Sequence, residues 1–331
     1  MHNYTAIIPV AGTGTRLRPH TYTYPKVLLT VGDKPILGHI LDRLREAKFK
    51  KVCLIIGYLG EKVREYVSKN YGDLEVAYVV QEEQRGLGHA IWLTKAFVSG
   101  PAFIILGDTL IEADLPEFLK GDFDRIAVKE VEDPKRFGVV KVKNGFIESM
   151  VEKPEKPVSN LAIVGIYSFK NSDILYNNLD RLAKTGKTTK GEMQLTDAMS
   201  LMMEAGHKIK PVKIEGWFDC GKPETLLSTN RYILAKKQEN IQVCHKDYLL
   251  IKPVYISKTA KVRNSIIGPN VSVGDDAVIE NSIISDSIIN EGAVIKSANL
   301  DKSLIGPNAV VEGRIDSINI GENSEIKLSK E

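Results

Sequence analysis

The stretch from Ile7 to Lys26 carries residue types that can hold a polyphosphate. An apolar run, Ala6 to Val10, ends in a turn that contains Gly12 and Gly14. A glycine turn at the carboxyl end of a strand leaves backbone N–H groups open to an anion, because no Cβ blocks close approach. Three cations follow this turn: Arg16, Arg18 and Lys26. The stretch therefore predicts polyphosphate binding and stabilisation of charge in phosphoryl chemistry.

Two common phosphate-binding loops are excluded by the spacing. The P-loop needs a Lys followed by Ser or Thr after its second glycine, and none follows here. The dinucleotide fingerprint needs a third glycine at the position of Leu17. A plain glycine turn remains an alternative for the segment AGTGT taken alone.

Two other strand ends carry polar residues. Gln81 closes an apolar run, and its amide offers the donor and acceptor that suit the N3–H and a carbonyl of uracil or thymine. Asp108 ends the run Phe103–Gly107, where a carboxylate is well placed as a hard oxygen ligand for Mg²⁺. The alternatives are an exposed glutamine before a helix and an aspartate that caps a turn.

The full pattern A-G-T-G-T-R-L-R-P…P-K resembles the signature of the sugar-1-phosphate nucleotidyltransferases. The resemblance implies that the glycine loop wraps the nucleotide and that Arg16 and Lys26 contact the phosphates. It places Gln81 and Gly86 at the base pocket. The nucleotide-binding residues it implies are Ala11, Gly12, Gly14, Thr15, Gln81 and Gly86.

Later motifs follow in the order that the family shows. R-F-G-V-V from residue 136, E-K-P from residue 152 and V-G-I-Y from residue 164 resemble the sugar-phosphate side. By this resemblance Glu152 accepts hydrogen bonds from sugar hydroxyls and Lys153 binds the sugar phosphate. The residues that let the sugar approach the backbone, or border its pocket, are Gly138, Val164, Gly165 and Glu192. Without the resemblance, E-K-P would be an ordinary charged strand end.

The motif G-W-F-D-C-G resembles the family element that supplies a second carboxylate to the metal. The resemblance therefore implies that Asp108 and Asp219 bind one Mg²⁺ ion. Catalysis is assigned on the same basis to Arg16, Lys26, Asp108 and Asp219.

Short apolar runs alternate with helical patterns in the first part of the chain. This alternation predicts an α/β, Rossmann-like, mixed and mostly parallel sheet with helices on both faces. The expected strands are Ile7–Val10, Val52–Gly57, Val76–Gln81, Phe103–Gly107 and Ile126–Val131. The expected helices are Ile36–Ala47, Glu61–Tyr71, Gly88–Val98, one beginning at Lys190, and Pro223–Gln238. Asn144-Gly145 predicts a hairpin with Phe146–Glu152 as its return strand.

From about Ile251 the helical signals give way to Ile and Val at steps of five or six residues. The same face returns after 15 to 17 residues, as in Val262, Ile279, Ile295, Val311 and Ile326. One inward side chain per short strand and three strands per coil predict a triangular parallel β-helix of four to five coils. It resembles the left-handed hexapeptide-repeat helix found in many of these transferases. The expected domains are residues 1–240 and 241–331.

Composition limits the remaining classes. The chain has 331 residues, 43% of them hydrophobic, and a net charge of +3 with mixed signs, which gives no argument for nucleic acid or a membrane surface. No apolar run approaches the roughly 20 residues that span a bilayer. The N-terminus MHNYT shows no signal peptide. The three cysteines, Cys53, Cys220 and Cys244, are too far apart in the sequence to suggest a zinc site. Since neither a signal peptide nor a membrane span is recognised, a cytoplasmic protein is expected.

These observations predict an Mg²⁺-dependent enzyme that joins a sugar 1-phosphate, with glucose as the favoured sugar, to dTTP or UTP. The expected partners are these two substrates and other copies of the chain. Two alternatives stay open: a non-catalytic nucleotide-binding scaffold, and a bifunctional enzyme with acetyl transfer in the β-helix. Acetyl transfer usually relies on a histidine base, and the last histidine, His245, precedes the coils.

Overall fold

The computed structural model describes residues 3–156, 158–237, 242–244, 246–313 and 318–327. Its internal contacts divide the chain into two compact units. The first, here called the sheet unit, comprises Met1–Gly12 and Ile40–Trp217. The second, the coil unit, comprises Thr13–His39 and Phe218–Glu331. The division expected at residue 240 stays a prediction, and each unit is described by itself.

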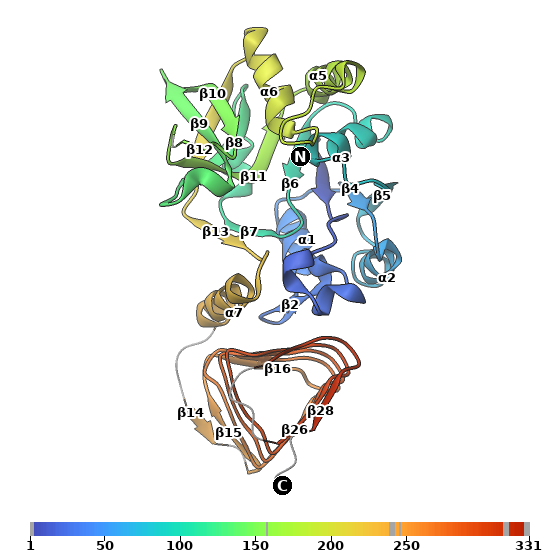
Figure 1. The fold of residues 1–331 in the computed structure, drawn as a ribbon, viewed down its shortest axis with the longest axis vertical. Helices are drawn as coiled ribbons and strands as arrows, with labels where there is room; N and C mark the ends of the chain where they lie inside the picture. Colours follow the sequence, from blue (N-terminus) through green and yellow to red (C-terminus); the bar gives the residue numbers. More distant parts are fainter. Residues whose placement is uncertain (1–2, 157, 238–241, 245, 314–317, 328–331) are drawn as a thin grey trace. The chain divides into compact units, whose positions relative to one another are not determined.

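The sheet unit is built on one mixed sheet whose central path is β10-β9-β11-β6-β1-β4-β5 (Figure 1). Strands β1, β4, β5 and β6 run parallel, whereas β11 pairs antiparallel with β6, β8 and β9. The strands are β1 Thr5–Pro9, β4 Lys51–Ile56, β5 Glu75–Val80, β6 Ala102–Ile105, β8 Asp124–Glu130, β9 Gly138–Lys143, β10 Phe146–Glu152, β11 Leu161–Phe169 and β12 Ile209–Lys213. The predicted α/β class with a mixed, mostly parallel sheet is confirmed.

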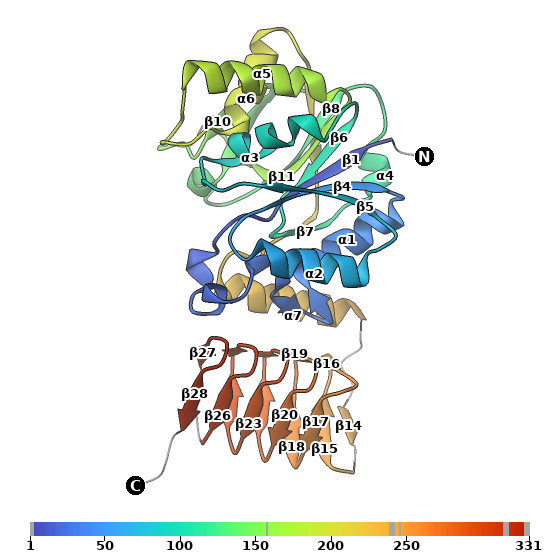
Figure 2. The same ribbon diagram turned by 90° about the vertical axis from the view of Figure 1, so that its right-hand side faces the viewer.

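Helices cover both faces of this sheet. In Figure 2, α3, α5 and α6 lie on one face, and α1 and α2 lie on the other. The helices are α1 Ile36–Glu46, α2 Gly60–Asn70, α3 Leu87–Leu93, α4 Leu115–Phe118, α5 Ser172–Thr185 and α6 Leu195–Glu204. Each covers the sheet through its apolar side; in α1, Ile40, Leu41 and Leu44 are all buried.

One predicted helix start is wrong. The helix expected from Lys190 begins at Leu195 instead. Lys190 and Gly191 have φ angles of 55° and 81°, which no right-handed helix accommodates. Thr189 and Glu192 close a tight turn by two backbone hydrogen bonds of 2.9 and 3.2 Å. This turn leaves Glu192 on a loop, where it can face a ligand.

The remaining short elements are distributed over the two units. They are β7 Thr109–Glu112, β13 Gly216–Asp219, and 3₁₀ turns at Thr15–Leu17, His20–Tyr22, Lys26–Leu28, Thr94–Ala96 and Pro134–Arg136. The hairpin predicted at Asn144-Gly145 joins β9 to β10, and both turn residues have positive φ, as a type I′ turn requires. The return strand spans Phe146–Glu152, as predicted.

The coil unit contains the predicted β-helix, drawn as a triangular coil in Figure 1. Its three faces are the sheets β14-β15-β18-β21-β24, β16-β19-β22-β25-β27 and β17-β20-β23-β26-β28. Successive coils pair in parallel, and Val262, Ile279, Ile295, Val311 and Ile326 occupy one register column. The predicted left-handed β-helix is thereby confirmed, together with the spacing of its interior residues.

The strands of the β-helix are two to four residues long. They are β14 Gln242–Cys244, β15 Tyr248–Ile251, β16 Val254–Ile256, β17 Lys261–Arg263, β18 Ser265–Ile267, β19 Val271–Val273, β20 Val278–Glu280, β21 Ile283–Ser285, β22 Ile288–Ile289, β23 Val294–Lys296, β24 Asn299–Asp301, β25 Leu304–Ile305, β26 Val310–Glu312, β27 Asn319–Ile320 and β28 Glu325–Lys327. The coil unit also holds β2 Thr30–Val31, β3 Lys34–Pro35 and α7 Pro223–Lys237. The side chain of Cys244 and the whole of Ile315 and His245 lie outside the described residues.

Candidate functional site

Four parallel strands of the sheet unit end at one edge, and the predicted nucleotide residues follow them. Ala11 and Gly12 come after β1, Gln81 after β5, and Asp108 after β6. Backbone hydrogen bonds continue past the strand ends, from Val10 N to Ile55 O at 2.8 Å and from Gly107 N to Pro9 O at 3.2 Å. The chain leaves β1 for β4 on one side and returns to β6 on the other, so β1 marks the switch point where such sheets bind ligands.

Gln81 is buried, with 7% of its surface exposed, and its amide has defined partners. Its Nε2 donates to the Gly86 carbonyl at 3.3 Å and meets His89 Nδ1 at 3.2 Å. Burial lowers the pKa of His89, and the Arg85 charge acts in the same direction. His89 is therefore a neutral acceptor that orients the Gln81 amide.

Gln84 links two of the predicted nucleotide loops, and the sequence did not single it out. Its Nε2 donates to the Ala11 carbonyl at 2.9 Å and so ties the loop after β5 to the loop after β1. A Cβ added at Gly57, which follows β4, would lie 3.0 Å from both the Ala11 carbonyl and Cβ. Only the polar run EEQRG pointed to this loop, and it could not separate Gln84 from its neighbours.

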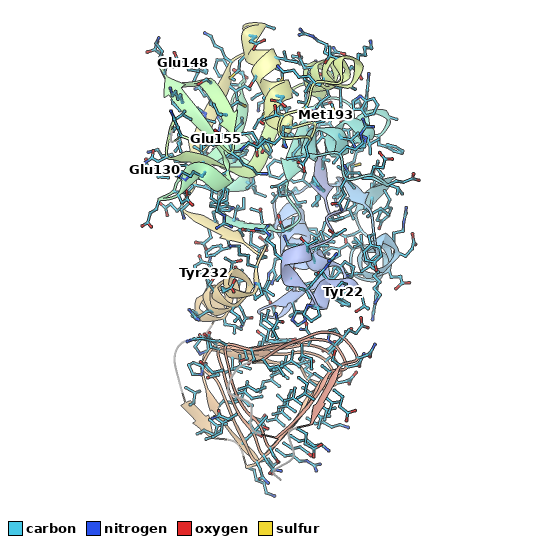
Figure 3. All side chains as sticks on the ribbon, viewed as in Figure 1. Tyr22, Glu130, Glu148, Glu155, Met193 and Tyr232 are labelled. Atoms are coloured by element: carbon cyan, nitrogen blue, oxygen red, sulfur yellow. The ribbon has the colours of Figure 1, made fainter. Side chains whose placement is uncertain are left out.

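The loop that carries Glu192 is attached to the loop that carries Gly86. Gly88 N donates to Met193 O at 2.8 Å, and Met193 N donates to Arg85 O at 2.9 Å. Met193 is labelled in Figure 3. Gly86 has φ +106°, and a Cβ there would lie 2.6 Å from the Met193 carbonyl. The predicted base-side glycine and the predicted sugar-side glutamate therefore belong to one constellation.

Glu152 lies at the end of β10, opposite Gly138. Its Oε2 accepts from Thr196 Oγ1 at 3.3 Å and would lie 2.9 Å from a Cβ at Gly138. Burial raises the pKa of Glu152, and the Lys153 charge opposes that shift. Thr196 was not among the predicted residues.

Val164 and Gly165 occur within β11, next to the same sheet edge. Val164 is buried in the core, so only its backbone is available to a ligand. Gly165 has φ +82°, and a Cβ there would lie 2.4 Å from Leu106 Cδ1. Lys153 has φ +43°, so the chain turns sharply directly after Glu152.

The remaining phosphate residues belong to the coil unit. Gly14 has φ +62°, and a Cβ there would lie 2.9 Å from Thr21 Cγ2 and 3.1 Å from Lys26 Cβ. The Thr21 hydroxyl donates to the Gly14 carbonyl at 2.7 Å. Thr15 and Arg16 are exposed at the start of the following 3₁₀ turn. Gly14 and Lys26 are thus neighbours in space, as polyphosphate binding requires.

Arg16 and Asp219 meet at Gly221. A Cβ placed on Gly221 would lie 2.9 Å from Arg16 Nη2 and 2.7 Å from Asp219 Oδ1. A guanidinium binds phosphate and a carboxylate binds a hard cation, so the chemistry of this pair fits the predicted Mg²⁺–triphosphate site. The glycine after W-F-D-C thus has a physical reason, because any side chain would displace both groups.

Gly221→Ala is therefore expected to lower kcat/KM of the transfer by about 10²-fold, since displacing catalytic groups by about 1 Å has that effect. Steady-state kinetics on the purified variant check this. Gly72→Ala is the matched control, because the nearest atom to a Cβ there is 3.9 Å away and its φ is not positive. Equal kinetics in the two variants would show that the Arg16–Asp219 pair does not act in catalysis.

No group of three or more His, Cys, Asp or Glu side chains that could hold a metal occurs among the described residues. The two predicted ligands are Asp108 in the sheet unit and Asp219 in the coil unit, both half-buried at strand ends. Their carboxylates are the ligand type that Mg²⁺ prefers, and a bound Mg²⁺ would also need oxygen ligands from water or substrate. Their joint role stays a prediction.

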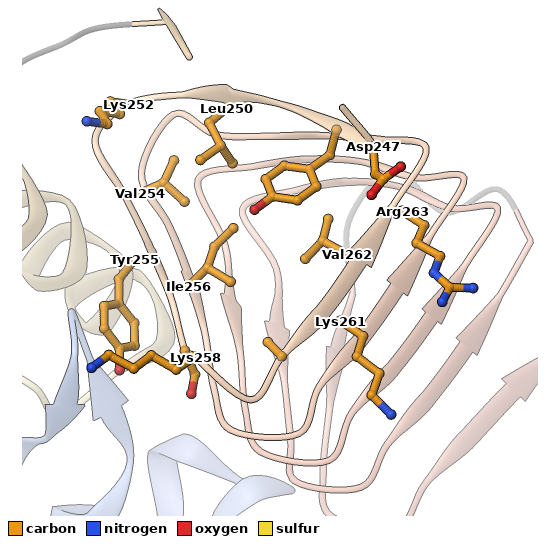
Figure 4. Close-up of a pocket in the computed structure, with 13 residues that line it drawn as sticks. Asp247, Leu250, Lys252, Val254, Tyr255, Ile256, Lys258, Lys261, Val262 and Arg263 are labelled. Carbon is orange, nitrogen blue, oxygen red and sulfur yellow. The ribbon is translucent and has the colours of Figure 1, made fainter. Parts of the chain in front are cut away.

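The first coil of the β-helix encloses a cavity of about 620 Å³. In Figure 4, Leu250, Val254, Ile256 and Val262 line its interior, and charged residues such as Lys261 and Arg263 stand at its edge. None of its described lining residues is a histidine.

Two further findings concern membrane-spanning helices and the reactivity of the cysteines. Among the residues that the structure describes, no helix is long and apolar enough to cross a membrane. Cys53 and Cys220 are buried thiols, and burial raises the pKa of Cys53 to about 12. A thiol of such high pKa is a poor nucleophile at neutral pH.

Comparison with known proteins supports the predicted family. The sequence model described as Nucleotidyl transferase matches residues 5–236. Low-salt glycan biosynthesis nucleotidyltransferase Agl11 of Haloferax volcanii is 33% identical, over 96% of this chain and 98% of the relative. Glucose-1-phosphate thymidylyltransferase of Streptomyces griseus is 29% identical, over 98% and 99% of the two chains.

A solved structure of UDP-glucose pyrophosphorylase complexed with UDP-glucose has a TM-score of 0.63 and 27% identity. It is matched over 71% of this chain and 99% of its own. The chain also resembles bifunctional proteins GlmU; it spans 61% of the length of that of Methanococcus maripaludis.

Proposed function

The chain belongs to the nucleotidyl transferase family, and we propose that it joins a sugar 1-phosphate to dTTP or UTP. A phosphate oxygen of the sugar 1-phosphate attacks the α-phosphorus in line. The bond from the α-phosphorus to the bridging oxygen breaks, and pyrophosphate leaves with that oxygen. No side-chain nucleophile is needed, so positioning and charge neutralisation supply the catalysis. The meeting of Arg16, Asp219 and Gly221 is the observation that carries this proposal.

In the proposed nucleotide site, side-chain charges, the loop backbone and a metal ion all act on the triphosphate. Arg16 and Lys26 neutralise charge on the phosphates, and the backbone of Ala11, Gly12, Gly14 and Thr15 surrounds them. Transferases of this family generally use a divalent metal. We assign Mg²⁺ to Asp108 and Asp219; when bound, it neutralises charge at the α-phosphate.

Gln81 supports uracil or thymine as the base. With its Nε2 bonded to Gly86 and His89, its Oε1 carbonyl is the atom that accepts the N3–H of either base. Gly86 then allows the base to lie against the backbone. Cytosine has no N3–H, so this arrangement disfavours it.

Glucose 1-phosphate is the sugar that we propose. Glu152 accepts hydrogen bonds from the sugar hydroxyls, Lys153 binds the phosphate, and Glu192 closes the pocket. The backbone of Gly138, Val164 and Gly165 allows the ring to approach closely. Thr196 holds Glu152 in position.

The pH dependence of sugar binding tests the role of Glu152. Because burial raises the pKa of this carboxyl group, its accepting carboxylate form becomes populated only as pH rises through the raised value. The KM for sugar 1-phosphate is therefore expected to fall as pH rises and then to level off. Glu152→Gln should remove this change and leave only the titration of the substrate phosphate. An unchanged profile in that variant would contradict the assignment.

The broader organisation is also part of the proposal. We propose that residues 1–240 form the transferase part and residues 241–331 the β-helix, and that the chain forms a homo-oligomer. The expected cytoplasmic location stays a prediction. Acetyl transfer is not proposed, because it usually relies on a histidine base and the last histidine, His245, precedes the coils.

The test is a matrix of substrates. Pyrophosphate release is measured with each NTP and dTTP against the 1-phosphates of glucose, mannose, galactose and N-acetylglucosamine, in Mg²⁺. The proposal expects dTTP or UTP with glucose 1-phosphate to exceed other pairs. Nucleotide binding without release from any pair would overturn the enzyme assignment and leave a nucleotide-binding scaffold.

A further inference from the structure

Within the coil unit, one face of the β-helix packs against the segment that carries the phosphate residues. This face is the sheet β16-β19-β22-β25-β27. Its outward-pointing column runs through Ser272, Ile288, Leu304 and Asn319, and the first three of these are buried. The residues that lie on it come from the phosphate segment, here Gly14–Gly32, and from α7.

The first connection joins the last described coil to the 3₁₀ turn His20–Tyr22. The His20 ring Nε2 is hydrogen-bonded to Asn319 Oδ1 of β27. Next to this bond, a Cβ on Gly321 would lie 3.2 Å from Pro19 Cβ. His20 is only 2% exposed, and burial lowers its pKa, so the ring is neutral and donates through Nε2. Pro19 therefore packs closely against the backbone of Gly321.

The same turn fixes the glycine loop. Thr21, adjacent to His20 and 3% exposed, donates its hydroxyl to the Gly14 carbonyl at 2.7 Å. Thr21 and Lys26 also lie against the Cα of Gly14. If His20 moves, the adjacent Thr21 therefore moves with it and shifts the backbone of the segment that carries Arg16 and Lys26.

The second connection is Asn230 of α7, which is 1% exposed and has its amide bonded on both sides. Its Oδ1 accepts from Gly32 N and from Ser272 Oγ, both at 2.7 Å, and its Nδ2 donates to the Asn270 carbonyl at 3.1 Å. One side chain thus joins the end of the phosphate segment to the second coil. Arg231 of the same helix forms an ion pair with Asp286 of the third coil.

We propose that the β-helix positions the phosphate segment for the transfer reaction, and that Asn319 is a positioning residue that acts on triphosphate binding through His20 and Thr21. This inference rests on the proposed function. It gives the β-helix a role in the reaction, because the last described coil holds a loop whose side chains, by the proposed function, contact the nucleotide. Asn230 anchors the other end of that loop in the same way.

Asn319→Leu tests the inference in the full-length protein. Leu304 occupies the same column one coil earlier, so leucine is compatible with the β-helix at this position. Loss of one hydrogen bond corresponds to about 0.5–1.5 kcal/mol, so the KM for the nucleoside triphosphate is expected to rise about 2- to 10-fold. The KM for sugar 1-phosphate should stay unchanged. Asn319→Asp keeps the acceptor oxygen and should restore the wild-type KM.

Asn299→Leu is the matched control, because Asn299 is an exposed outward residue of β24 on another face. The inference is overturned if the triphosphate KM of Asn319→Leu equals that of wild type. It is equally overturned if both substrates' KM values rise together with a lower melting temperature, as a purely structural role would produce. If Asn319→Leu does not fold, Asn319→Ala is compared in the same way.

Measuring the wild-type protein distinguishes a failure of the proposed transferase function from a failure of the positioning role of Asn319. A wild-type chain that releases no pyrophosphate from any substrate pair refutes the proposed function itself. An active wild type whose Asn319 variants bind triphosphate normally refutes only the positioning role.

Discussion

Asp108→Asn is expected to lower the rate of pyrophosphate release by about 10²- to 10³-fold, the effect of removing one electrostatic group from a transition state. Asp108 follows β6 beside the switch point of the sheet, and its side chain is half-buried. The substitution keeps the size of the side chain and removes its charge, so the proposed metal site would lose a ligand while the loop keeps its shape. Single-turnover kinetics with saturating Mg²⁺ measure the loss.

Asp122→Asn is the control for that experiment, because Asp122 is exposed in the same unit. It should leave the rate unchanged. Circular dichroism should show that both variants fold. Near-normal turnover of folded Asp108→Asn would refute its assignment as a metal ligand.

Arg16→Ala is expected to lower kcat/KM for the triphosphate by about 10²-fold, as the loss of a charge-stabilising donor does in other active sites. The Arg16 side chain is exposed and lies beside Gly221 and Asp219, so its removal leaves the core intact. Arg16→Lys should recover only part of the loss, because an ammonium lacks the planar fork that matches phosphate.

Arg18 supplies a matched control two residues away. Its guanidinium lies over the Tyr22 ring, 4.8 Å from the centroid, and is also exposed. Arg18→Ala removes the same charge from the same loop and should cost less than about tenfold, as expected for a screened surface charge. If Arg16→Ala and Arg18→Ala lose the same activity, net charge rather than the position of Arg16 governs triphosphate binding.

The β-helix could be predicted from the sequence because its residue pattern repeats over short distances along the chain. Each short strand points one aliphatic side chain inward, so the spacing of Val262, Ile279 and Ile295 gives the number of residues in each coil. The Asn144-Gly145 hairpin was predictable for the same reason, since two positive φ angles favour these residue types.

The arrangement of the sheet could not be predicted in this way. Nothing in the run Leu161–Phe169 indicates that it pairs antiparallel with β6 and β8. The sequence also misplaced the start of α6, because the apolar residues from Leu195 onward fix the helix face but not its first residue. The positive φ angles of Lys190 and Gly191, which exclude a helix there, are seen only in the structure.

The motifs predict site residues but not the contacts that support them. Arg16, Gln81, Glu152 and Asp219 are predicted from motifs, and their roles stay predictions, whereas Gln84, Thr21 and Thr196 had no distinguishing pattern. These supporting residues act through contacts between segments far apart in the sequence, such as Gln84 with Ala11 and Thr196 with Glu152. Such pairs are set by the fold, so no local spacing reports them.

The most direct test of the account follows the phosphorus atoms of the preferred triphosphate through one turnover. Triphosphate labelled at the α- or at the γ-phosphorus is incubated with sugar 1-phosphate and Mg²⁺, and the products are separated. The account predicts that α-label appears in the nucleotide sugar and that γ-label appears in pyrophosphate, in equal amounts. Transfer of γ-label to the sugar, or its release as inorganic phosphate, would contradict attack at the α-phosphorus and with it the assigned function.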